Sequence, residues 1–172
     1  MNLDFSPAWI SLKTATVTTV ITFFLGIATA RWMLGYRGKN KGLIDAILTS
    51  PLVLPPTVTG FLLLLLLGRN GPLGHVLSSM GITLIFTWPA TVIAATVVSF
   101  PLMYKTSLAA FNQIDTSLLA CARTLGASEW RVFWQILLPL AKPGIIAGTL
   151  LAFARSLGEF GATLMLAGSI PG

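Results

Sequence analysis

The sequence contains few charged residues and a single cysteine. Of its 172 residues only 9% are charged, whereas 55% are hydrophobic; in a soluble domain roughly a quarter of residues are charged. This composition excludes an ordinary water-soluble protein and indicates a chain that lies in a lipid bilayer. A single cysteine excludes an intrachain disulfide. Because no second thiol stands near Cys121, we expect it to be a small packed residue rather than a redox centre or a metal ligand.

Residues suited to catalysis are also scarce. The five acidic residues form no metal-binding cluster, and the sequence has no G-x-x-x-x-G-K-[ST] loop for the phosphates of a nucleotide. The one histidine, His75, stands between glycines and small polar residues without a potential co-ligand nearby, so we assign it no role. We therefore expect no catalytic residue, no metal site and no cofactor bound by this chain.

Long apolar windows dominate what is present. A membrane-spanning helix needs about 20 apolar residues, and the windows that meet this requirement are residues 10–34, 43–67, 82–104 and 143–167. The first window has no A-x-A-like cleavage site, so we predict a retained span and not a signal peptide. No linker is long enough to separate two domains. The windows predict a single all-α transmembrane domain over residues 1–172 with four spans.

Basic residues gather in two of the connections between these windows. They are Arg31, Arg37, Lys39 and Lys41 around the first connection, and Lys105, Arg123, Arg131 and Lys142 in the third. The second connection has only Arg69. Because loops rich in Lys and Arg stay in the cytoplasm, we predict a multi-pass protein of the cell (inner) membrane with its N-terminus outside. The net charge of +6 then reflects topology, and no nucleic-acid partner is needed.

The second window is rich in proline. Its segment 51–60 reads PLVLPPTVTG. Each proline removes a backbone donor and crowds the carbonyl one turn earlier, so we predict a kinked or locally unwound helix. Such a break is tolerated in a membrane where neighbouring helices or a water-lined path satisfy the freed groups. Two interpretations stay open, a packing kink or a lining of the permeation path. The candidate path residues are Pro55, Pro56, Thr57, Thr59 and, near the end of the third window, Ser99.

The third connection, about residues 115–142, is a polar, helix-forming insert between apolar segments. Asp115 can cap a helix over residues 116–125, and Gly126 can end that helix in the left-handed conformation. Ser128 offers a second N-cap. The pattern predicts a helix, a turn and a second helix.

The two helices of the insert differ in their side chains. Ala120 and Thr124 are small and share one face of the first helix, where another surface can approach closely. The second helix carries Trp130, Phe133 and Trp134, which suit packing at the base of the membrane domain or at the membrane interface. The alternatives are a hairpin that merely joins two spans and a DNA-binding helix-turn-helix. The second is disfavoured, because a recognition helix needs polar side chains and WRVFWQILL offers mostly apolar bulk.

Several segments carry a resemblance to a known family. They read PLVLPPTVTG (51–60), SFPLM (99–103), ARTLGASEWRVF (122–133), LPLAKPGIIAGTLLAFARSLGEFGAT (138–163) and SIPG at the end. Together they resemble the permease subunits of molybdate ABC importers, in the oxyanion branch of binding-protein-dependent importer permeases. The insert resembles the coupling loop of these permeases, whose pattern begins Glu-Ala-Ala, continues to a Gly and ends in Leu-Pro. Ala120 stands where the family usually has Glu, and relatives continue beyond Gly172 with about one more helix, so we expect a chain without its last span.

The resemblance implies a type I importer permease (MetI-like) fold that pairs as a homodimer. It implies cytoplasmic ABC ATPase subunits that bind ATP and magnesium, and a periplasmic or extracellular oxyanion-binding protein. It implies uptake of molybdate through a membrane subunit that is not itself an enzyme. A sulfate or tungstate permease, or a nonfunctional truncated permease acting as a membrane scaffold, is the alternative. The ATPase-coupling residues by this resemblance are Ala120, Cys121, Ala122, Thr124, Leu125, Gly126, Leu138 and Pro139.

Arg155 and Glu159 place two charges inside the fourth window. Arg155 lies twelve residues beyond Pro143, or about 18 Å along a helix, near the middle of a hydrocarbon core about 30 Å thick. Glu159 follows at i+4 on the same face, so the two can pair and reduce the cost of burying either charge. The pair either holds the interior of the dimer together or lies near the substrate path or gate.

Overall fold

A computed structural model describes residues 6–68, 71–79, 87–159 and 163, and in these residues the chain is helical. The elements are α1 (Ser6–Gly35), α2 (Lys41–Val53), α3 (Pro56–Leu67), α4 (Pro72–Ser79), α5 (Trp88–Asn112), α6 (Thr116–Thr124), α7 (Glu129–Val132), a π-helical turn η1 (Phe133–Leu137) and α8 (Leu138–Leu157). Among the described residues, three helices are long and apolar enough to cross a membrane, or four if α2 and α3 form one bent span. The predicted all-α membrane class is confirmed.

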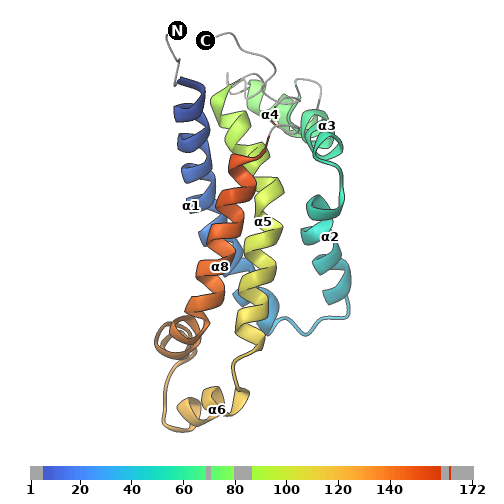
Figure 1. Ribbon diagram of the computed structural model, residues 1–172. Coiled ribbons are helices and arrows are strands. Elements are labelled where there is room, and N and C mark those ends of the chain that lie inside the picture. Colours follow the sequence, from blue (N-terminus) through green and yellow to red (C-terminus); the bar gives the residue numbers. More distant parts are fainter. Residues whose placement is uncertain (1–5, 69–70, 80–86, 160–162, 164–172) are drawn as a thin grey trace.

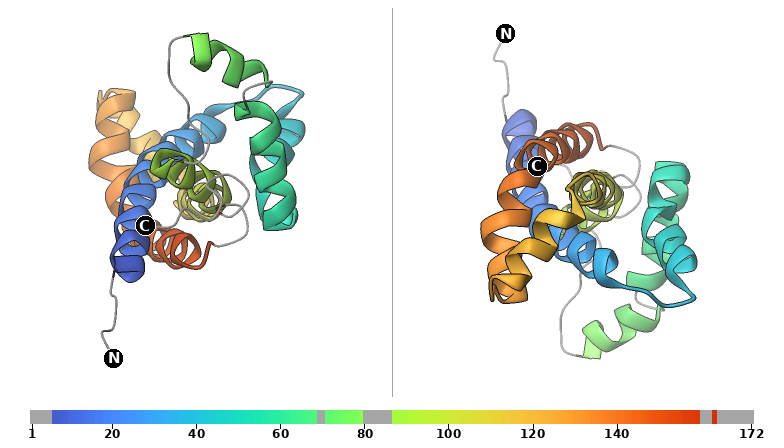
Figure 2. Two further views of the ribbon diagram at one scale, coloured as in Figure 1. Left: turned by 90° about the horizontal axis from the view of Figure 1, so that it is seen from above. Right: turned by 90° about the horizontal axis from the view of Figure 1, so that it is seen from below.

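The core is a bundle of α1, α5 and α8. Seen along the bundle, these three helices pack side by side, and α2 and α3 lie to one side of them (Figure 2). Glycines allow the close approach, because a Cβ added to Gly26 of α1 would lie 2.6 Å from Met103 Cγ and one added to Gly144 of α8 would lie 2.5 Å from Ala110 Cβ, both on α5. The bundle is therefore stabilised by close packing of the helix backbones at these glycines as well as by burial of apolar side chains.

The proline-rich window is two helices. α2 ends at Val53, Leu54 and Pro55 are extended, and α3 begins at Pro56. The segment Lys41–Val53 makes an angle of 115° with the segment Pro56–His75. The residue before a proline is disfavoured in the α region, and the pair Pro55-Pro56 imposes this restriction on two successive residues. The sequence predicted one helix over 43–67 that is kinked or locally unwound near these prolines, and the structure shows a full interruption at that position, with two extended residues between two helices.

Other helix limits also differ from the apolar windows. α5 continues past Tyr104 to Asn112, and α8 begins at Leu138, five residues before the predicted window. The segment after Lys105 reads TSLAAFN, without a glycine or proline to end the helix, and it buries Ala110 and Phe111, so α5 continues through it. The predicted second connection contains a short helix, α4, and exposed His75 lies in it. Residues 82–86, predicted to begin the third span, lie outside the described residues.

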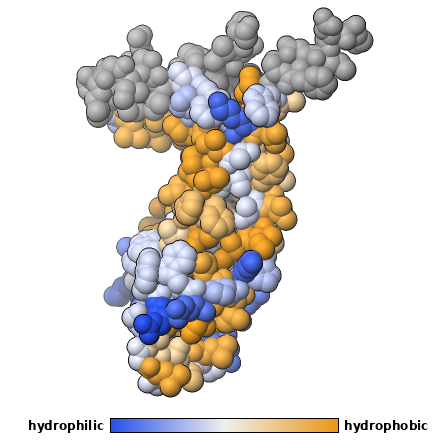
Figure 3. All heavy atoms as spheres, turned by 90° about the vertical axis from the view of Figure 1, so that its left-hand side faces the viewer, coloured by the Kyte–Doolittle hydropathy of each residue, from blue (hydrophilic) through white to orange (hydrophobic). Residues whose placement is uncertain are grey.

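The bundle has two chemically different ends. The connection between α1 and α2 and the α6–α7 segment lie at one end, and α1 begins at the other (Figure 1). Both predicted basic connections therefore fall at the same end. On the face shown in Figure 3, the middle is mostly apolar and many of the hydrophilic side chains lie toward the α6–α7 end. We call this the basic end.

Candidate functional site

The insert forms a capped helix and a tight turn. Asp115 Oδ1 accepts a hydrogen bond of 2.9 Å from the Ser117 backbone N–H, which caps α6 and lowers the pKa of the Asp115 carboxyl. Gly126 has φ 82°, and its N–H donates to the Arg123 carbonyl at 3.0 Å while Ala127 N–H donates to the Ala122 carbonyl at 3.1 Å. These two bonds define a Schellman ending, as the sequence predicted, with α6 one residue shorter than expected.

The second helix is capped and tied back to the first. Ser128 Oγ accepts from the Arg131 N–H at 3.3 Å, at the predicted N-cap. Glu129 contacts Arg123 through both carboxylate oxygens, at 2.5 and 3.2 Å, and lies 3.5 Å from Arg31 of α1. Glu129 thus joins α6, α7 and α1. Local spacing in the sequence does not indicate these partner arginines.

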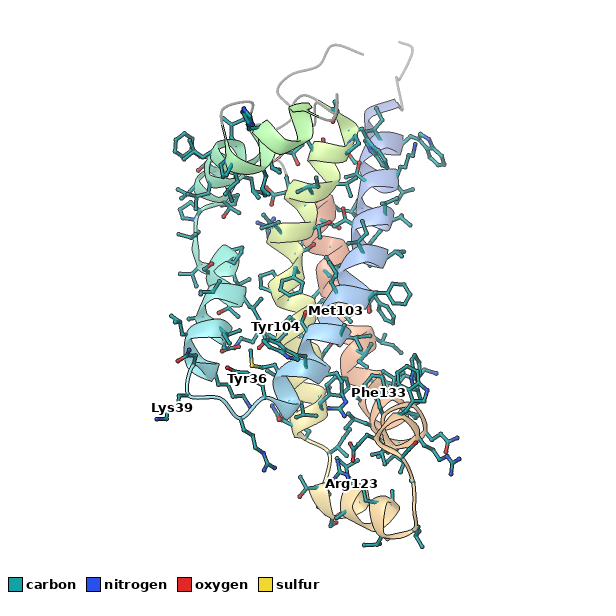
Figure 4. The ribbon with its side chains drawn as sticks, turned by 180° about the vertical axis from the view of Figure 1, so that it is seen from behind. Tyr36, Lys39, Met103, Tyr104, Arg123 and Phe133 are labelled. Carbon is teal, nitrogen blue, oxygen red and sulfur yellow. The ribbon has the colours of Figure 1, made fainter. Side chains whose placement is uncertain are left out.

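We call residues 116–132 the α6–α7 hairpin. Its α6 arm, which carries Arg123, projects beyond the ends of α1 and α5 (Figures 1 and 4). Its outer surface is the α6 face, defined by the exposed residues Ala120, Cys121, Thr124 and Leu125. Leu125 is 83% exposed.

The structure separates the remaining predicted coupling residues from this face. Ala122 is buried at 9% exposure and faces the hairpin interior. Leu138 and Pro139 begin α8, on the other side of η1 from α6. The expectation that Cys121 is a packed residue is wrong: Cys121 is exposed, because its position on α6 is on the outer surface.

The aromatic residues after the turn divide between the core and the surface. Phe133 packs edge-on against Phe111 of α5, with ring centroids 6.2 Å apart, and Leu137 is buried. The rings of Trp130 and Trp134 pack against each other with centroids 5.5 Å apart, and the two residues are 72% and 49% exposed. One side of this segment fixes the hairpin to the bundle, and the other presents tryptophan outward.

The five candidate path residues differ in their burial. Ser99 is buried and donates to the Ala95 carbonyl at 2.6 Å, and Thr59 is buried on α3. Pro55 and Thr57 are exposed and Pro56 is half-buried. Their contribution to a path stays a prediction.

Arg155 and Glu159 lie in contact at the end of α8. Arg155 Nη1 is 2.6 Å from Glu159 Oε2, and the Glu159 side chain is 1% exposed against 29% for Arg155. Arg155 occupies the last turn of α8, which ends at Leu157. Of the predicted continuation of this span to 167, Gly158, Glu159 and position 163 are described, and residues 160–162 and 164–167 lie outside the described residues.

Sequence reasoning missed a polar contact between α2 and α5. Tyr104 Oη donates to Asp45 Oδ1 at 2.7 Å, and Lys105 Nζ lies 2.6 Å from Asp45 Oδ2. Figure 4 shows Tyr104 on the flank of α5 that faces α2. The available signal was Asp45 itself, an acidic residue in a predicted span, where a charge requires a partner.

Comparison with known proteins places the chain in a family. The family described as "Binding-protein-dependent transport system inner membrane component" matches residues 22–171. The molybdenum transport system permease protein ModB of Escherichia coli (strain K12) is 47% identical over 171 residues, which cover 96% of this chain and 75% of that protein. A putative molybdenum transport system permease protein of Bacillus subtilis (strain 168) is 42% identical, over 98% of this chain and 74% of its own length.

A more distant relative is named for a different cargo. The probable sulfate transport system permease protein of Chlorokybus atmophyticus is 36% identical over 94% of this chain and 57% of its own length. The match of the family over residues 22–171, together with relatives above 40% identity, identifies the chain as a member of the binding-protein-dependent transport system inner membrane components.

Proposed function

We propose that this chain is the membrane permease subunit of an ABC importer that moves molybdate into the cytoplasm. The relatives at 47% and 42% identity are molybdenum transport permeases, which supports molybdate over sulfate. Tungstate is a divalent tetrahedral oxyanion of nearly equal size, and discrimination between the two falls mainly to the binding protein that delivers the cargo. The chain supplies the passage, and partner ATPase subunits, with ATP and magnesium, supply the energy.

The proposed orientation puts the basic end in the cytoplasm and the N-terminus outside. Both basic connections lie at that end of the bundle (Figure 1), and short loops rich in Lys and Arg remain on the cytoplasmic side. The opposite end then meets the external oxyanion-binding protein.

The observation that carries the proposal is the α6–α7 hairpin. Two N-caps, a Schellman turn and the Glu129 contacts fix its shape. Its α6 face is exposed and, apart from Leu125, consists of small side chains. A rigid projection with small side chains suits close docking to another protein. We propose that the α6 face docks on the ATPase, and that two copies of the chain form the complete passage.

The Arg155–Glu159 pair fits a conduit better than a high-affinity site. An arginine could attract an oxyanion, but a carboxylate at 2.6 Å neutralises its charge. Cargo would then pass without being held, as transport requires. Glu159→Gln is expected to impair assembly of the complex if the pair is structural, and to alter transport with normal assembly if the pair lies at the gate.

Uptake measured in proteoliposomes tests the cargo. The chain, its ATPase and its binding protein are reconstituted, and accumulation of molybdate is followed with and without ATP. We expect molybdate to accumulate only with ATP. Added tungstate is expected to reduce this accumulation, and added sulfate is expected to leave it unchanged. Accumulation of sulfate at equal efficiency would support a sulfate permease instead, and no accumulation would support the scaffold alternative.

Labelling of Cys121 tests the orientation. Cys121 is the one cysteine of the sequence and is exposed, so an impermeant maleimide reports its side of the membrane in cells that express the chain without its ATPase. We expect labelling only after permeabilisation. His75→Cys in a Cys121→Ala background is the matched control, since exposed His75 lies on α4 near the opposite end, and it is expected to label in intact cells. The reverse pattern would contradict the orientation.

A further inference from the structure

An apolar groove of about 900 Å³ lies between α1 and the segment that leads from α7 into α8. Phe24 and Ala28 of α1 form one wall, and Trp130 and Trp134 are on the other. Ligand pockets span about 300–1,000 Å³, so this groove is large enough for a sizeable ligand. The proposed transport function assigns no role to the residues named on these two walls.

The depth of the groove matches one leaflet of a bilayer. Its α1 wall runs from Phe23 to Gly35, which is about 18 Å at 1.5 Å per residue. Half of a hydrocarbon core is about 15 Å. The groove therefore extends from the basic end of the bundle to near the level of the bilayer centre.

Tryptophans mark the outer part of the groove. Trp32, Trp130 and Trp134 all line it and are 51%, 72% and 49% exposed. Tryptophan is enriched at the headgroup level of membranes, where one side of the ring is apolar and the other contacts polar groups. The basic end of the groove thus lies at headgroup level, with the apolar wall at Phe24 deeper in the acyl region.

The charge at this end favours an anionic ligand. Residues 31–45 and 105–142 contain eight basic and three acidic residues. Arg31 lines the groove and its side chain is 34% exposed. Its carboxylate neighbour Glu129 is 3.5 Å away and is held more closely by Arg123, at 2.5 Å. Basic pockets between helices on the cytoplasmic side are typical sites for anionic lipid headgroups.

We propose that this groove binds one anionic phospholipid, with an acyl chain along the α1 wall and the headgroup phosphate at Arg31. The guanidinium has five N–H donors, so it can contact a phosphate and keep Glu129. Because Glu129 also holds Arg123 of α6, the bound lipid steadies the hairpin from the membrane side. The proposal concerns the chain in its membrane and does not depend on the cargo.

Lipid retention by the purified chain tests the proposal. The full chain is extracted from vesicles of phosphatidylglycerol and phosphatidylcholine, and the lipid kept after delipidation is counted by native mass spectrometry. We expect one retained phosphatidylglycerol, preferred over phosphatidylcholine. Ala28→Trp fills the groove from an exposed position and is expected to reduce retention about tenfold, or 1.4 kcal/mol. Arg31→Gln is expected to remove the preference for phosphatidylglycerol and to leave retention of phosphatidylcholine unchanged.

Val20→Trp is the matched control, because Val20 is 52% exposed on α1 and does not line the groove. It is expected to retain lipid as the parent chain does. Equal retention by Ala28→Trp and the parent would overturn the proposal, as would the absence of any headgroup preference. If Ala28→Trp instead separates a dimer into monomers with no change in bound lipid, the groove is an interface between copies and the lipid proposal is wrong.

Discussion

At the level of single residues, Asp45 explains how α2 stays on the bundle. None of the side chains of α2 is buried, so apolar packing holds this helix only weakly. Asp45 bonds both Tyr104 and Lys105 of α5. Tyr104 is fully buried, whereas the side chains of Lys105 and Asp45 are 43% and 33% exposed. The tyrosine contact therefore matters more than the lysine contact, which water screens.

The first prediction compares the loss of both contacts of Asp45 with the loss of the lysine contact alone. Asp45→Ala leaves the buried Tyr104 hydroxyl unpaired, so we expect the free energy of unfolding to fall by about 1–3 kcal/mol. Lys105→Ala removes only a part-exposed ion pair and is expected to cost less than about 1 kcal/mol. Thermal or denaturant unfolding in detergent measures both. A larger loss for Lys105→Ala than for Asp45→Ala would contradict this ranking.

The second prediction concerns Gly148 on α8. A Cβ at this position would collide with Thr106 Oγ1 and lie 3.2 Å from Met103 Sδ, so Gly148→Ala forces α8 away from α5. We expect a loss of about 1–3 kcal/mol in the free energy of unfolding. Gly42→Ala is the control, because nothing lies within 4 Å of its added Cβ, and an exposed helical alanine is expected to stabilise by up to about 1 kcal/mol. Equal effects at the two positions would argue against close packing of these helices.

At the level of elements, the hairpin depends on local rules that a sequence displays directly. Asp115, Gly126 and Ser128 act within a few residues of their own positions, so their roles could be predicted. The bend between α2 and α3 was predicted in position, since successive prolines are a local signal, but its angle depends on how α3 packs against α5. The contacts of Glu129 with Arg31, and of Asp45 with Tyr104, join residues far apart in the chain, and spacing alone does not indicate them.

The third prediction concerns the turn of the hairpin. Gly126 has φ 82° and open space around it, so Gly126→Ala costs backbone energy alone, about 1–2 kcal/mol. Gly126→Asn is expected to cost less, because asparagine tolerates this conformation. Hydrogen exchange of the α6 amides measures the loss of order. Equal protection in Gly126→Ala and the parent would show that the turn does not fix α6.

The fourth prediction concerns pH. The Ser117 N–H bond lowers the pKa of Asp115, so its cap is fully present above the ordinary value of about 3.9 and is lost as pH falls through the lowered value. We expect protection factors of the first turn of α6 to be constant from neutral pH down to that ordinary value and to fall only in stronger acid. Asp115→Asn should keep the cap and remove the pH dependence. A loss of protection between neutrality and that value would contradict the assignment of the cap to Asp115.

At the level of the whole molecule, the chain combines an apolar bundle with one basic, structured end. Membership of the family indicates that the bundle is part of a transport system. The hairpin is the proposed contact with its ATPase. Cargo identity rests on relatives, because no described residue of the bundle separates molybdate from tungstate by its chemistry. Coupling, by contrast, rests on the α6 face, which substitution can test directly.

The most direct test is ATP hydrolysis by the reconstituted complex with and without molybdate-loaded binding protein. We expect stimulation for the parent chain and for Ala120→Glu, which introduces the residue usual at this position in the family. We expect Ala120→Trp, which places a large ring on the exposed α6 face, to abolish stimulation while the bundle stays folded. If the binding protein does not change hydrolysis by the parent complex, or if Ala120→Trp is fully stimulated, the α6 face is not the site of coupling to an ATPase.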